Sequence, residues 1–555
     1  MIQAEPRNSA TAVLTAGPAA RTASPATAST AIPTSSLAEH LRSLVGAANL
    51  VTDAAELAGW SADIYRTGVP AELVVSPGTV DEVAAVVKTC TDADRAVIPL
   101  GGGFSYTGGY LATRPQTVVV NLRRLDRILE INTDDMYVTV ECGCSWKTLY
   151  DALQQKGVRT PYFGPISGFA STVGGALSQG SFFMGSTQYG TTAESTLGLE
   201  VVLADGTLLR TGSGATPYEP SPFFRTYGPD LTGVFLGDTG ALGFKVRATL
   251  KLIPAPKTYR YATYSFADDA LVLKVVAEIA RRGLAADCYA WDPYVVQNFS
   301  KRDVAVTEGL EYLAGVVKSG SSMLSGLKDA ARIAVAGQRF ARSALYMVHA
   351  TVDESIEAAA DAKIRAIEEI CTRAGGVATE ASVPRALRGL PFSYPNRILG
   401  LKGERWVPTN ALVPHSRATA VLAAFRDYMQ QHDAVIRKFG FEYGIIFFAV
   451  GNNTLCIEPL LYWPDARLPS HDRLMEADYR KTVPVVPENA ESREAMKALR
   501  AGLVEMFMHK GCVHVQIGKF YRYKDGRDPA TWALLLSIKS ALDPRGLVNP
   551  GSLGL

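Results

Sequence analysis

The sequence predicts a chain of two or three domains that combine α-helices with β-strands. Its 555 residues are more than one hydrophobic core usually serves. Strand-like and helix-like patterns alternate through the first half, where three glycine-rich blocks interrupt them, at 99–109, 164–180 and 237–243. After Pro256 these blocks stop, and strand-like segments alternate with helical ones, which indicates a second domain.

The composition excludes several classes of protein. With 47% hydrophobic and 20% charged residues and a net charge of +2, the chain is typical of a soluble globular protein and carries no basic field for nucleic acid. No apolar run reaches the about 18 residues of a membrane span. Seven cysteines without a Cys-x-x-Cys pair indicate buried free thiols and a reducing compartment, and we expect the cytoplasm. Residues 1–36, rich in Ala, Thr, Ser and Pro, are predicted to be a disordered tail, although their arginines also fit a targeting peptide.

Local patterns define the elements of the first domain, which we place at 37–256. Apolar residues at 80, 83, 86 and 87 predict a helix, and a second helix over 145–156 ends at Gly157. Asp205-Gly206 predicts the tight turn of a hairpin. The strands expected in this domain are 96–100, 117–122, 137–142, 197–203 and 245–253.

The second domain is placed at 257–485, and residues 486–555 are predicted to return to the first domain. The segment 542–551 carries the asparagine, proline and glycine residues of this return. The expected strands are 259–266, 344–352, 445–450 and 454–460, and the expected helices are 269–282 and 354–374.

The first glycine block has the composition of an anion-binding loop. Three glycines follow the apolar run 96–100, and Ser105 and two more glycines come next. Without a Cβ, several backbone N–H groups can approach a diphosphate at once. The block is neither a G-x-G-x-x-G nor a G-x-x-x-x-G-K-[ST] motif. An ordinary turn is the alternative interpretation, and the two later glycine blocks favour the diphosphate site.

Five motifs in one order resemble those of a known family. They are the three glycine blocks, the hairpin Ala204-Asp-Gly206, and Leu542-Asp-Pro-x-Gly-x-x-Asn-Pro-Gly551. The chain resembles the flavoproteins typified by vanillyl-alcohol oxidase and p-cresol methylhydroxylase, which include FAD-dependent D-lactate dehydrogenases. The resemblance implies an α+β fold: an FAD-binding domain of two subdomains (37–256), a cap domain whose antiparallel sheet is flanked by helices (257–485), and a C-terminal return to the FAD-binding domain (486–555).

The resemblance also implies FAD as the cofactor and suggests its contacts. The first block would wrap the diphosphate, the second would line FAD further along, and the third would border the path from adenine to isoalloxazine. The implied contacts are Pro99, Gly101, Gly102, Gly103, Phe104, Ser105, Gly108, Gly109, Pro165, Ser171, Thr172, Gly174, Gly175, Gly180, Tyr189, Gly190, Gly240, Gly243 and Asn549.

Departures from the family change the expected chemistry. Phe104 and Leu412 occupy positions where relatives tether FAD through a histidine, and His415 would need a register shift, so we expect non-covalent FAD. The phenol-binding Tyr and the Asp near the flavin become Thr107 and Thr191, which disfavours para-phenol oxidation. The histidine and carboxylate ligands of the hydroxy-acid branch are mostly missing as well, so no metal is predicted.

Side chains for the reaction are predicted beyond the FAD loops. His514 is the candidate base, because an imidazole titrates near about pH 6.5, and the alternative is a satisfied strand histidine. Tyr521 and Arg522 could orient and bind a substrate oxygen or carboxylate, or could belong to a solvated charged loop. Possible substrate contacts, or core residues in the alternative, are Arg405, Glu458, Tyr462 and Trp463.

The function expected is that of an FAD-dependent oxidoreductase. It would remove hydride from the CH–OH carbon of a small hydroxy acid or alcohol, aromatic ones included, to flavin N5 without a metal. One alternative is a para-substituted phenol or aromatic alcohol oxidase of the vanillyl-alcohol oxidase type. Another is a flavin-binding subunit of an electron-transfer complex. The electron acceptor stays open between O₂, a quinone and a cytochrome, and the resemblance makes a homodimer a candidate assembly.

Overall fold

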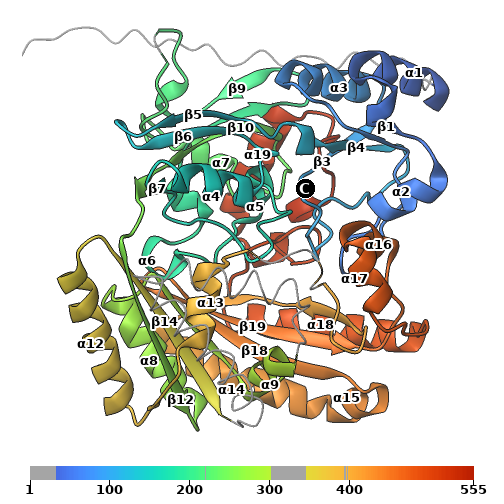
Figure 1. Ribbon diagram of the computed structural model, residues 1–555. Helices are drawn as coiled ribbons and strands as arrows, with labels where there is room; N and C mark the ends of the chain where they lie inside the picture. Colours follow the sequence, from blue (N-terminus) through green and yellow to red (C-terminus); the bar gives the residue numbers. More distant parts are fainter. Residues whose placement is uncertain (1–32, 219, 302–344, 393–395, 397) are drawn as a thin grey trace, which may run out of the picture.

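Three large β-sheets and a two-stranded sheet of β7 (Val158–Arg159) and β11 (Ile253–Pro254) organise the described part of the chain. The computed structural model describes residues 33–218, 220–301, 345–392, 396 and 398–555, without the side chains of 299–301. Two sheets, of four and five strands, lie in the upper half of Figure 1, and an eight-stranded sheet lies in the lower half. No helix in these described ranges is long and apolar enough to cross a membrane.

The four-stranded sheet positions the first glycine block. Its order is β1-β2-β4-β3, and β2, β4 and β3 run parallel, so the block at 101–109 leaves the carboxyl end of β3. Helices α1 and α3 pack against each other and bury Leu41 and Val83 over this sheet. The bounds are α1 (Thr34–Val45), β1 (Leu50–Val51), α2 (Ala54–Trp60), β2 (Leu73–Val75), α3 (Val80–Asp92), β3 (Ala96–Leu100) and β4 (Thr117–Asn121).

The five-stranded sheet is antiparallel and carries the second and third glycine blocks in its connections. Its order is β5-β6-β10-β8-β9. The predicted hairpin joins β8 to β9, with Gly206 at φ +85°. The bounds are β5 (Ile128–Asn132), β6 (Tyr137–Glu141), α4 (Trp146–Gln154), β7 (Val158–Arg159), α5 (Val173–Gln179), α6 (Ser186–Tyr189), β8 (Thr196–Val202), β9 (Leu208–Arg210), α7 (Leu231–Val234), β10 (Phe244–Lys251) and β11 (Ile253–Pro254).

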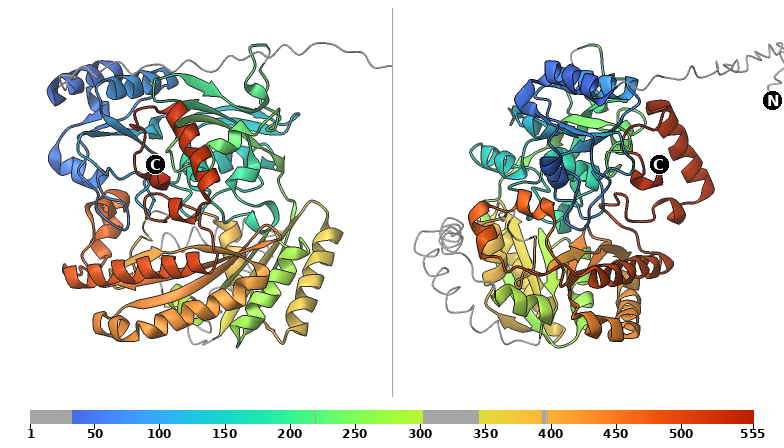
Figure 2. Two further views of the ribbon diagram at one scale, coloured as in Figure 1. Left: turned by 180° about the vertical axis from the view of Figure 1, so that it is seen from behind. Right: turned by 90° about the vertical axis from the view of Figure 1, so that its right-hand side faces the viewer.

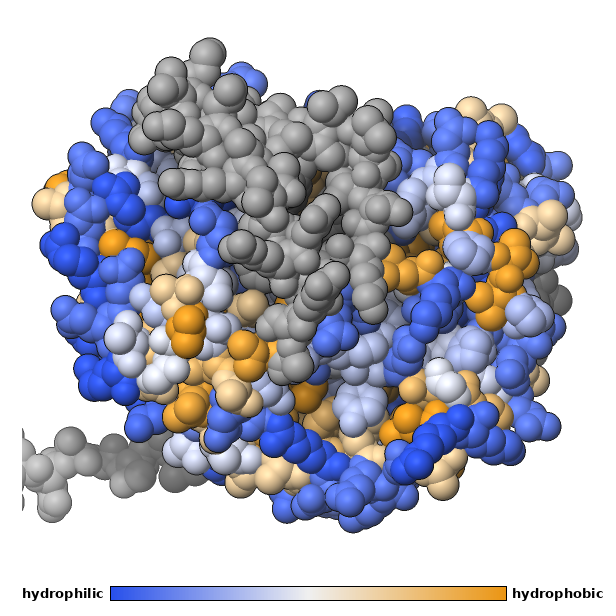
Figure 3. Space-filling view, turned by 60° about the horizontal axis from the view of Figure 1, so that its bottom comes forward, coloured by the Kyte–Doolittle hydropathy of each residue, from blue (hydrophilic) through white to orange (hydrophobic). Residues whose placement is uncertain are grey.

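The eight-stranded sheet forms the second domain. Its order is β15-β12-β14-β13-β18-β19-β16, and β17 also pairs with β19. Seen from this end of the molecule, the outer surface that is not drawn grey is mostly hydrophilic (Figure 3). The bounds are β12 (Thr258–Phe266), α8 (Asp269–Arg281), β13 (Asp287–Trp291), α9 (Pro293–Lys301), β14 (Tyr346–Glu354), α12 (Glu357–Arg373), β15 (Val377–Thr379), α13 (Ser382–Gly389), β16 (Arg405–Pro408), β17 (Ala411–Pro414), α14 (Ala418–Gln431), α15 (Asp433–Phe439), β18 (Glu442–Val450) and β19 (Thr454–Trp463).

The end of the chain connects both domains. Helix α18 (Ala490–His509) packs on α14 and β19, and Val513 pairs with Leu412 of β17. Helix α19 (Pro529–Leu542) lies on the outside of the first domain (Figure 2), and Val548 pairs with Val97 of β3. We therefore propose that the second domain extends from 257 to 513, beyond the predicted boundary at 485. The short helices α16 (Pro469–Leu474) and α17 (Ala477–Thr482) lie at the junction of the two domains.

The predicted α+β class is confirmed, and most predicted strands match to within one or two residues. The predicted strands 96–100 and 454–460, for example, correspond to β3 and to most of β19. Residues 1–32 of the predicted tail lie outside the described residues. Helix α1 begins at Thr34, inside the range predicted to be disordered, because Leu37, Ala38 and Leu41 bury one of its faces. All seven cysteines are buried free thiols, as predicted.

Candidate active site

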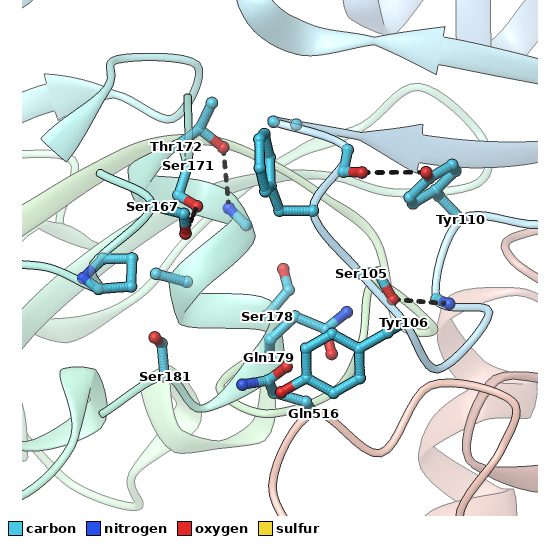
Figure 4. Close-up of a pocket in the computed structure, with 18 of the residues that line it drawn as sticks. Ser105, Tyr106, Tyr110, Ser167, Ser171, Thr172, Ser178, Gln179, Ser181 and Gln516 are labelled. Carbon is cyan, nitrogen blue, oxygen red and sulfur yellow. Dashed lines mark hydrogen bonds between the residues drawn. The ribbon is translucent and has the colours of Figure 1, made fainter. Parts of the chain in front are cut away.

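A cavity of 430 Å³ lies between the two domains. The first domain contributes the glycine blocks and several hydroxyl side chains to its wall, and the second domain contributes β16, β18 and β19. Figure 4 shows the hydroxyl-rich part, where serine and tyrosine side chains approach from the segments around β3 and α5. The two parts of this wall differ in chemistry, and we call them the loop wall and the cap wall.

In the loop wall, the first two glycine blocks approach each other too closely for side chains. A Cβ on Gly102 would stand 2.2 Å from the carbonyl oxygen of Ala170, and one on Gly101 would stand 2.3 Å from Oγ1 of Thr172. Real Cβ contacts are never that short, so these positions need glycine for packing alone. The result is a stretch of bare backbone along the cavity, which suits a diphosphate group.

Hydroxyl groups fix the two blocks and add polar groups to the loop wall. The Ser105 hydroxyl accepts a hydrogen bond from the Gly109 N–H at 3.3 Å, and the Tyr110 hydroxyl donates one to the Gly103 carbonyl at 3.0 Å (Figure 4). Thr172 caps α5 by accepting from the Gly175 N–H at 3.2 Å. Lys245 also lines the cavity, and its ammonium pairs with Asp238 at 2.6 Å.

The C-terminal return closes the loop wall from behind. Asn549 is 1% exposed, and its amide donates to the carbonyls of Gly109 at 2.9 Å and Thr239 at 2.8 Å. It therefore joins the first and third glycine blocks without lining the cavity. Gln516 does line the cavity, in a left-handed conformation at φ +54°. Its N–H donates to the carbonyl of Gln179 at 2.8 Å, which anchors the return to α5.

The cap wall follows from the alternation of side chains along three strands, β16, β18 and β19. In β19, Glu458, Leu460 and Tyr462 line the cavity, because residues two apart share one face of a strand. The intervening Ile457, Leu461 and Trp463 pack into the core on the other face. Aromatic and aliphatic groups dominate this wall. Besides the three residues of β19, it comprises Trp406, Pro408, Ile446 and Phe448, and Phe182 and Phe183 of the first domain pack against Phe448 beside it.

Two polar groups of the cap wall are left for a ligand. Burial raises the pKa of Glu458 to about 7, and no hydrogen bond to its carboxyl is found among the described residues. Nε1 of Trp406 is buried and has no acceptor within the described part of the chain. A carboxyl that titrates near neutrality in an apolar cavity is typical of a proton-transfer group.

The predicted base, His514, lies outside the residues that line the cavity. Its Nδ1 donates to the carbonyl of Asn410 at 2.6 Å, and its ring stacks on Tyr521 at 4.2 Å. Burial lowers the pKa of His514 to about 4, so the ring is neutral at physiological pH. Its Nε2 is buried and has no partner in the described ranges. The return runs along β17 here, which aims the ring at Asn410.

Four further residues that the sequence predicted for the reaction or the substrate do not line the cavity, because three are buried in structural contacts and one is exposed. Tyr521 is buried, and its hydroxyl accepts from the N–H of Asn410. Arg522 is exposed and pairs with Asp525 at 2.7 Å, as in the alternative of a solvated loop. Arg405 is 1% exposed and pairs with Asp465 at 2.9 Å, so its charge is already compensated. Trp463 lies under this guanidinium, on the face of β19 away from the cavity.

Most of the predicted FAD contacts come together in the loop wall. Those that line the cavity are Pro99, Gly101, Gly102, Gly103, Phe104, Ser105, Gly109, Pro165, Ser171, Thr172, Gly174, Gly175, Gly240 and Gly243. Those that do not line it are Gly108, Gly180, Tyr189, Gly190 and Asn549. Sequence reasoning missed Trp406, Gln516, Gln179 and Tyr106 as lining residues. Two of them gave a signal: Tyr106 is the neighbour of Thr107 in the first block, and Trp406 begins the segment that places Leu412.

Comparison with known proteins agrees with this geometry. Residues 71–212 match the family described as FAD binding domain, and residues 255–553, more than half of the chain, match the family described as FAD linked oxidases, C-terminal domain. The chain belongs to the FAD-linked oxidases. The predicted cofactor, FAD, is thereby confirmed, and so is the predicted family of oxidoreductases.

Relatives and solved structures of FAD-linked oxidases resemble the chain over different extents. It is 31% identical to the probable mitochondrial D-lactate dehydrogenase of Danio rerio over 246 residues, 44% of this chain and 48% of the relative. It is 32% identical to glycolate oxidase subunit GlcD of Bacillus subtilis (strain 168) over 187 residues, 34% of this chain and 38% of the relative. The chain thus spans about half or less of these relatives. The structure of p-cresol methylhydroxylase with substrate bound shares the fold, with a TM-score of 0.68 and 18% identity over 94% of this chain and 96% of that one.

The loop wall fits FAD, because bare backbone and hydroxyl groups suit a diphosphate nucleotide. Phe104 lines the cavity where some relatives carry a tethering histidine, and neither Leu412 nor His415 lines it. Non-covalent binding stays our prediction. Within the described residues, no group of three His, Cys, Asp or Glu side chains is placed to hold a metal ion.

Proposed function

We propose that this FAD-linked oxidase oxidises the CH–OH carbon of an apolar alcohol, aromatic alcohols included, with Glu458 as the base. The observation that carries the proposal is the unpartnered carboxyl of Glu458 on the cap wall, whose pKa burial raises to about 7. The proposal replaces His514, the base expected from the sequence, since its ring is directed at Asn410 and does not line the cavity.

Charge argues for a neutral alcohol over a hydroxy acid. A 2-hydroxy acid carries a carboxylate, which proteins usually bind with arginine or lysine. Among the described residues that line the cavity, Lys245 is the sole cation, and Asp238 already pairs with it. The predicted carboxylate ligands Arg405 and Arg522 pair elsewhere, with Asp465 and Asp525. A para-phenolate would also need a cation, so a phenol oxidase ranks below an alcohol oxidase as the second candidate.

The chemistry can be assigned to this chain's own groups. When bound, FAD supplies the acceptor for a hydride, which is two electrons and one proton. The ionised Glu458 carboxylate accepts the hydroxyl proton, so that the alcohol loses a proton and a hydride and becomes a carbonyl compound. Nε1 of Trp406 can donate a hydrogen bond to the substrate oxygen, and the rings of Phe448 and Tyr462 hold the apolar part and exclude water.

Anaerobic reduction of the purified protein tests this proposal. The visible flavin absorbance is followed while benzylic alcohols, aliphatic alcohols, 2-hydroxy acids and 4-alkylphenols are added in turn. Bleaching by neutral alcohols, and little by hydroxy acids of the same length, is the expected result. Bleaching by hydroxy acids or phenols first would overturn the substrate assignment. No bleaching of FAD-bound protein by any compound would favour the flavin-binding subunit.

Reoxidation of the bleached flavin identifies the electron acceptor. Air, a soluble quinone and a cytochrome c are added separately to the bleached protein, and the rate of flavin reoxidation is measured. Fast reoxidation in air makes the protein an oxidase, and reoxidation by the other two alone makes it a dehydrogenase. A location in the cytoplasm and a homodimer stay predictions.

A further inference from the structure

Arg473 brings a positive charge from the second half of the chain to the back of the first glycine block. It belongs to α16, which packs on α2 at the junction of the two domains (Figure 1). Its Nε donates to the carbonyl of Gly59 at 2.9 Å, and its guanidinium lies 4.5 Å from the ring centre of Trp60. These contacts fix the plane of the guanidinium.

One end of this guanidinium lacks a partner. Nη2 of Arg473 is buried, and no acceptor for it is found among the described residues. In the same described ranges no carboxylate lies within ion-pair distance of the side chain. Burial lowers the pKa of Arg473, and its side-chain interaction with the Tyr110 hydroxyl, a neutral group, opposes this shift. A buried cation without a counter-charge is costly, so it is usually kept for a ligand.

The unpartnered end faces a residue of the loop wall. A Cβ built on Gly103 would stand 3.0 Å from Nη2 of Arg473 and 3.6 Å from Nη1. Gly103 lines the cavity and has φ +80°, which favours glycine. Because Gly103 has no side chain, only backbone separates the guanidinium from the space along the loop wall.

We propose that Arg473, which does not itself line the cavity, strengthens binding of the FAD diphosphate from behind the first glycine block: its guanidinium packs against Gly103 and its positive charge complements the negative charge of the diphosphate. The inference rests on FAD as the cofactor and is independent of the proposed substrate. It makes the junction helix α16 part of the cofactor site, although α16 lies more than 350 residues after the first block. A purely structural role for Arg473, as a clamp between Gly59 and Trp60, is the alternative.

Flavin binding to the apoprotein tests this inference. The protein is stripped of FAD, and FAD or riboflavin, which lacks phosphate groups, is titrated while flavin fluorescence is recorded. For Arg473→Gln, the Kd for FAD should rise about tenfold or more, whereas the Kd for riboflavin should change less than about twofold. The dependence of log Kd for FAD on log salt should also become shallower, because one ionic contact is lost.

A matched control is Arg467→Gln, because Arg467 precedes α16 and pairs with Asp472 at 3.1 Å, away from the cavity lining. It should leave both Kd values unchanged. Equal weakening of FAD and riboflavin by Arg473→Gln, or no weakening of FAD, would overturn the proposal in favour of the structural clamp. If Arg473→Gln does not fold, Arg473→Lys decides: it keeps the charge and loses the fork, so the Kd for FAD should rise and the salt dependence should stay as in the unaltered protein.

Discussion

The two walls of the cavity are built on different principles. The loop wall is mostly backbone, held by contacts such as that between Gly102 and Ala170, and its hydroxyl groups are fixed by hydrogen bonds to that backbone. The cap wall is mostly side chains on three strands, and among the described lining residues its one carboxyl belongs to Glu458. The comparison suggests that a shared cofactor can be bound by backbone, which tolerates little variation, while substrate choice is left to side chains that can change one at a time.

The largest effect is expected at the carboxyl of the cap wall. Glu458→Gln keeps the shape of the side chain and removes the proposed base, so kcat should fall by about 10²–10⁴-fold. The Kd for FAD should stay the same, because the loop wall is untouched. Steady-state kinetics and flavin titration measure the two quantities.

The matched control for that variant is His514→Gln. Since His514 bonds to Asn410 and lies outside the cavity lining, its replacement should lower kcat far less than the change at Glu458. If His514→Gln lowers kcat far more than Glu458→Gln does, the base is His514, and its assignment to Glu458 is wrong.

The second effect belongs to the loop wall. Gly102→Ala places a Cβ 2.2 Å from the carbonyl of Ala170, and this overpacking should cost about 1–3 kcal/mol of unfolding free energy. FAD affinity should fall as well, with little change in the KM for alcohol. Thermal unfolding and flavin titration test this, with Gly526→Ala as the control, since its nearest atom would be Cε of Met508 at 3.9 Å. If Gly102→Ala and Gly526→Ala have equal effects, the two glycine blocks can move apart to admit a Cβ, and their close approach does not require glycine.

The third effect is the dependence of the rate on pH. A base must be ionised, and burial raises the pKa of Glu458 to about 7, so kcat/KM should fall as pH decreases below 7. Well below pH 7, kcat/KM should decrease about tenfold for each unit by which the pH is lowered. The pKa of His514 is lowered to about 4, so a histidine base would place this limb three units lower. A pH profile of the unaltered protein and of Glu458→Gln, which should lack the limb, separates the two.

The smallest effect is expected at Trp406. Trp406→Phe keeps an aromatic ring in the cap wall and removes the Nε1–H, which has no acceptor among the described residues. Loss of one hydrogen bond to the substrate oxygen should cost about 0.5–1.5 kcal/mol, or about 2–12-fold in kcat/KM for alcohols. An unchanged kcat/KM would mean that the indole serves only as an apolar surface.

The sequence predicted the loop wall well, because its signal is local. Glycine is needed where backbones meet, and a glycine pattern can be read without knowing the partner. The cap wall was harder to predict. Of the four predicted substrate contacts, Glu458 and Tyr462 line the cavity, whereas Arg405 and Trp463 do not and Trp406 does, since a shift of one residue moves a side chain to the other face of a strand.

The placement of His514 depended on contacts that the sequence does not reveal. Its ring direction is set by Asn410, 104 residues away, and by the stack on Tyr521. Likewise, the pKa of Glu458 depends on burial by strands and loops from both domains, which no local pattern reports. The position of Arg473 behind the first block is of the same kind, because it depends on the packing of α16 on α2 and on hydrogen bonds from Ser470 and Arg473 to the chain before that block.

The hydrogen bond from Asn549 to Gly109 joins residues 440 positions apart, and Val548 pairs with β3 beside it. A ribosome therefore makes the glycine loop early and the residues that brace it late. The first domain therefore completes these two contacts only after residue 549 has been synthesised, and we expect the finished shape of the glycine loop at that stage.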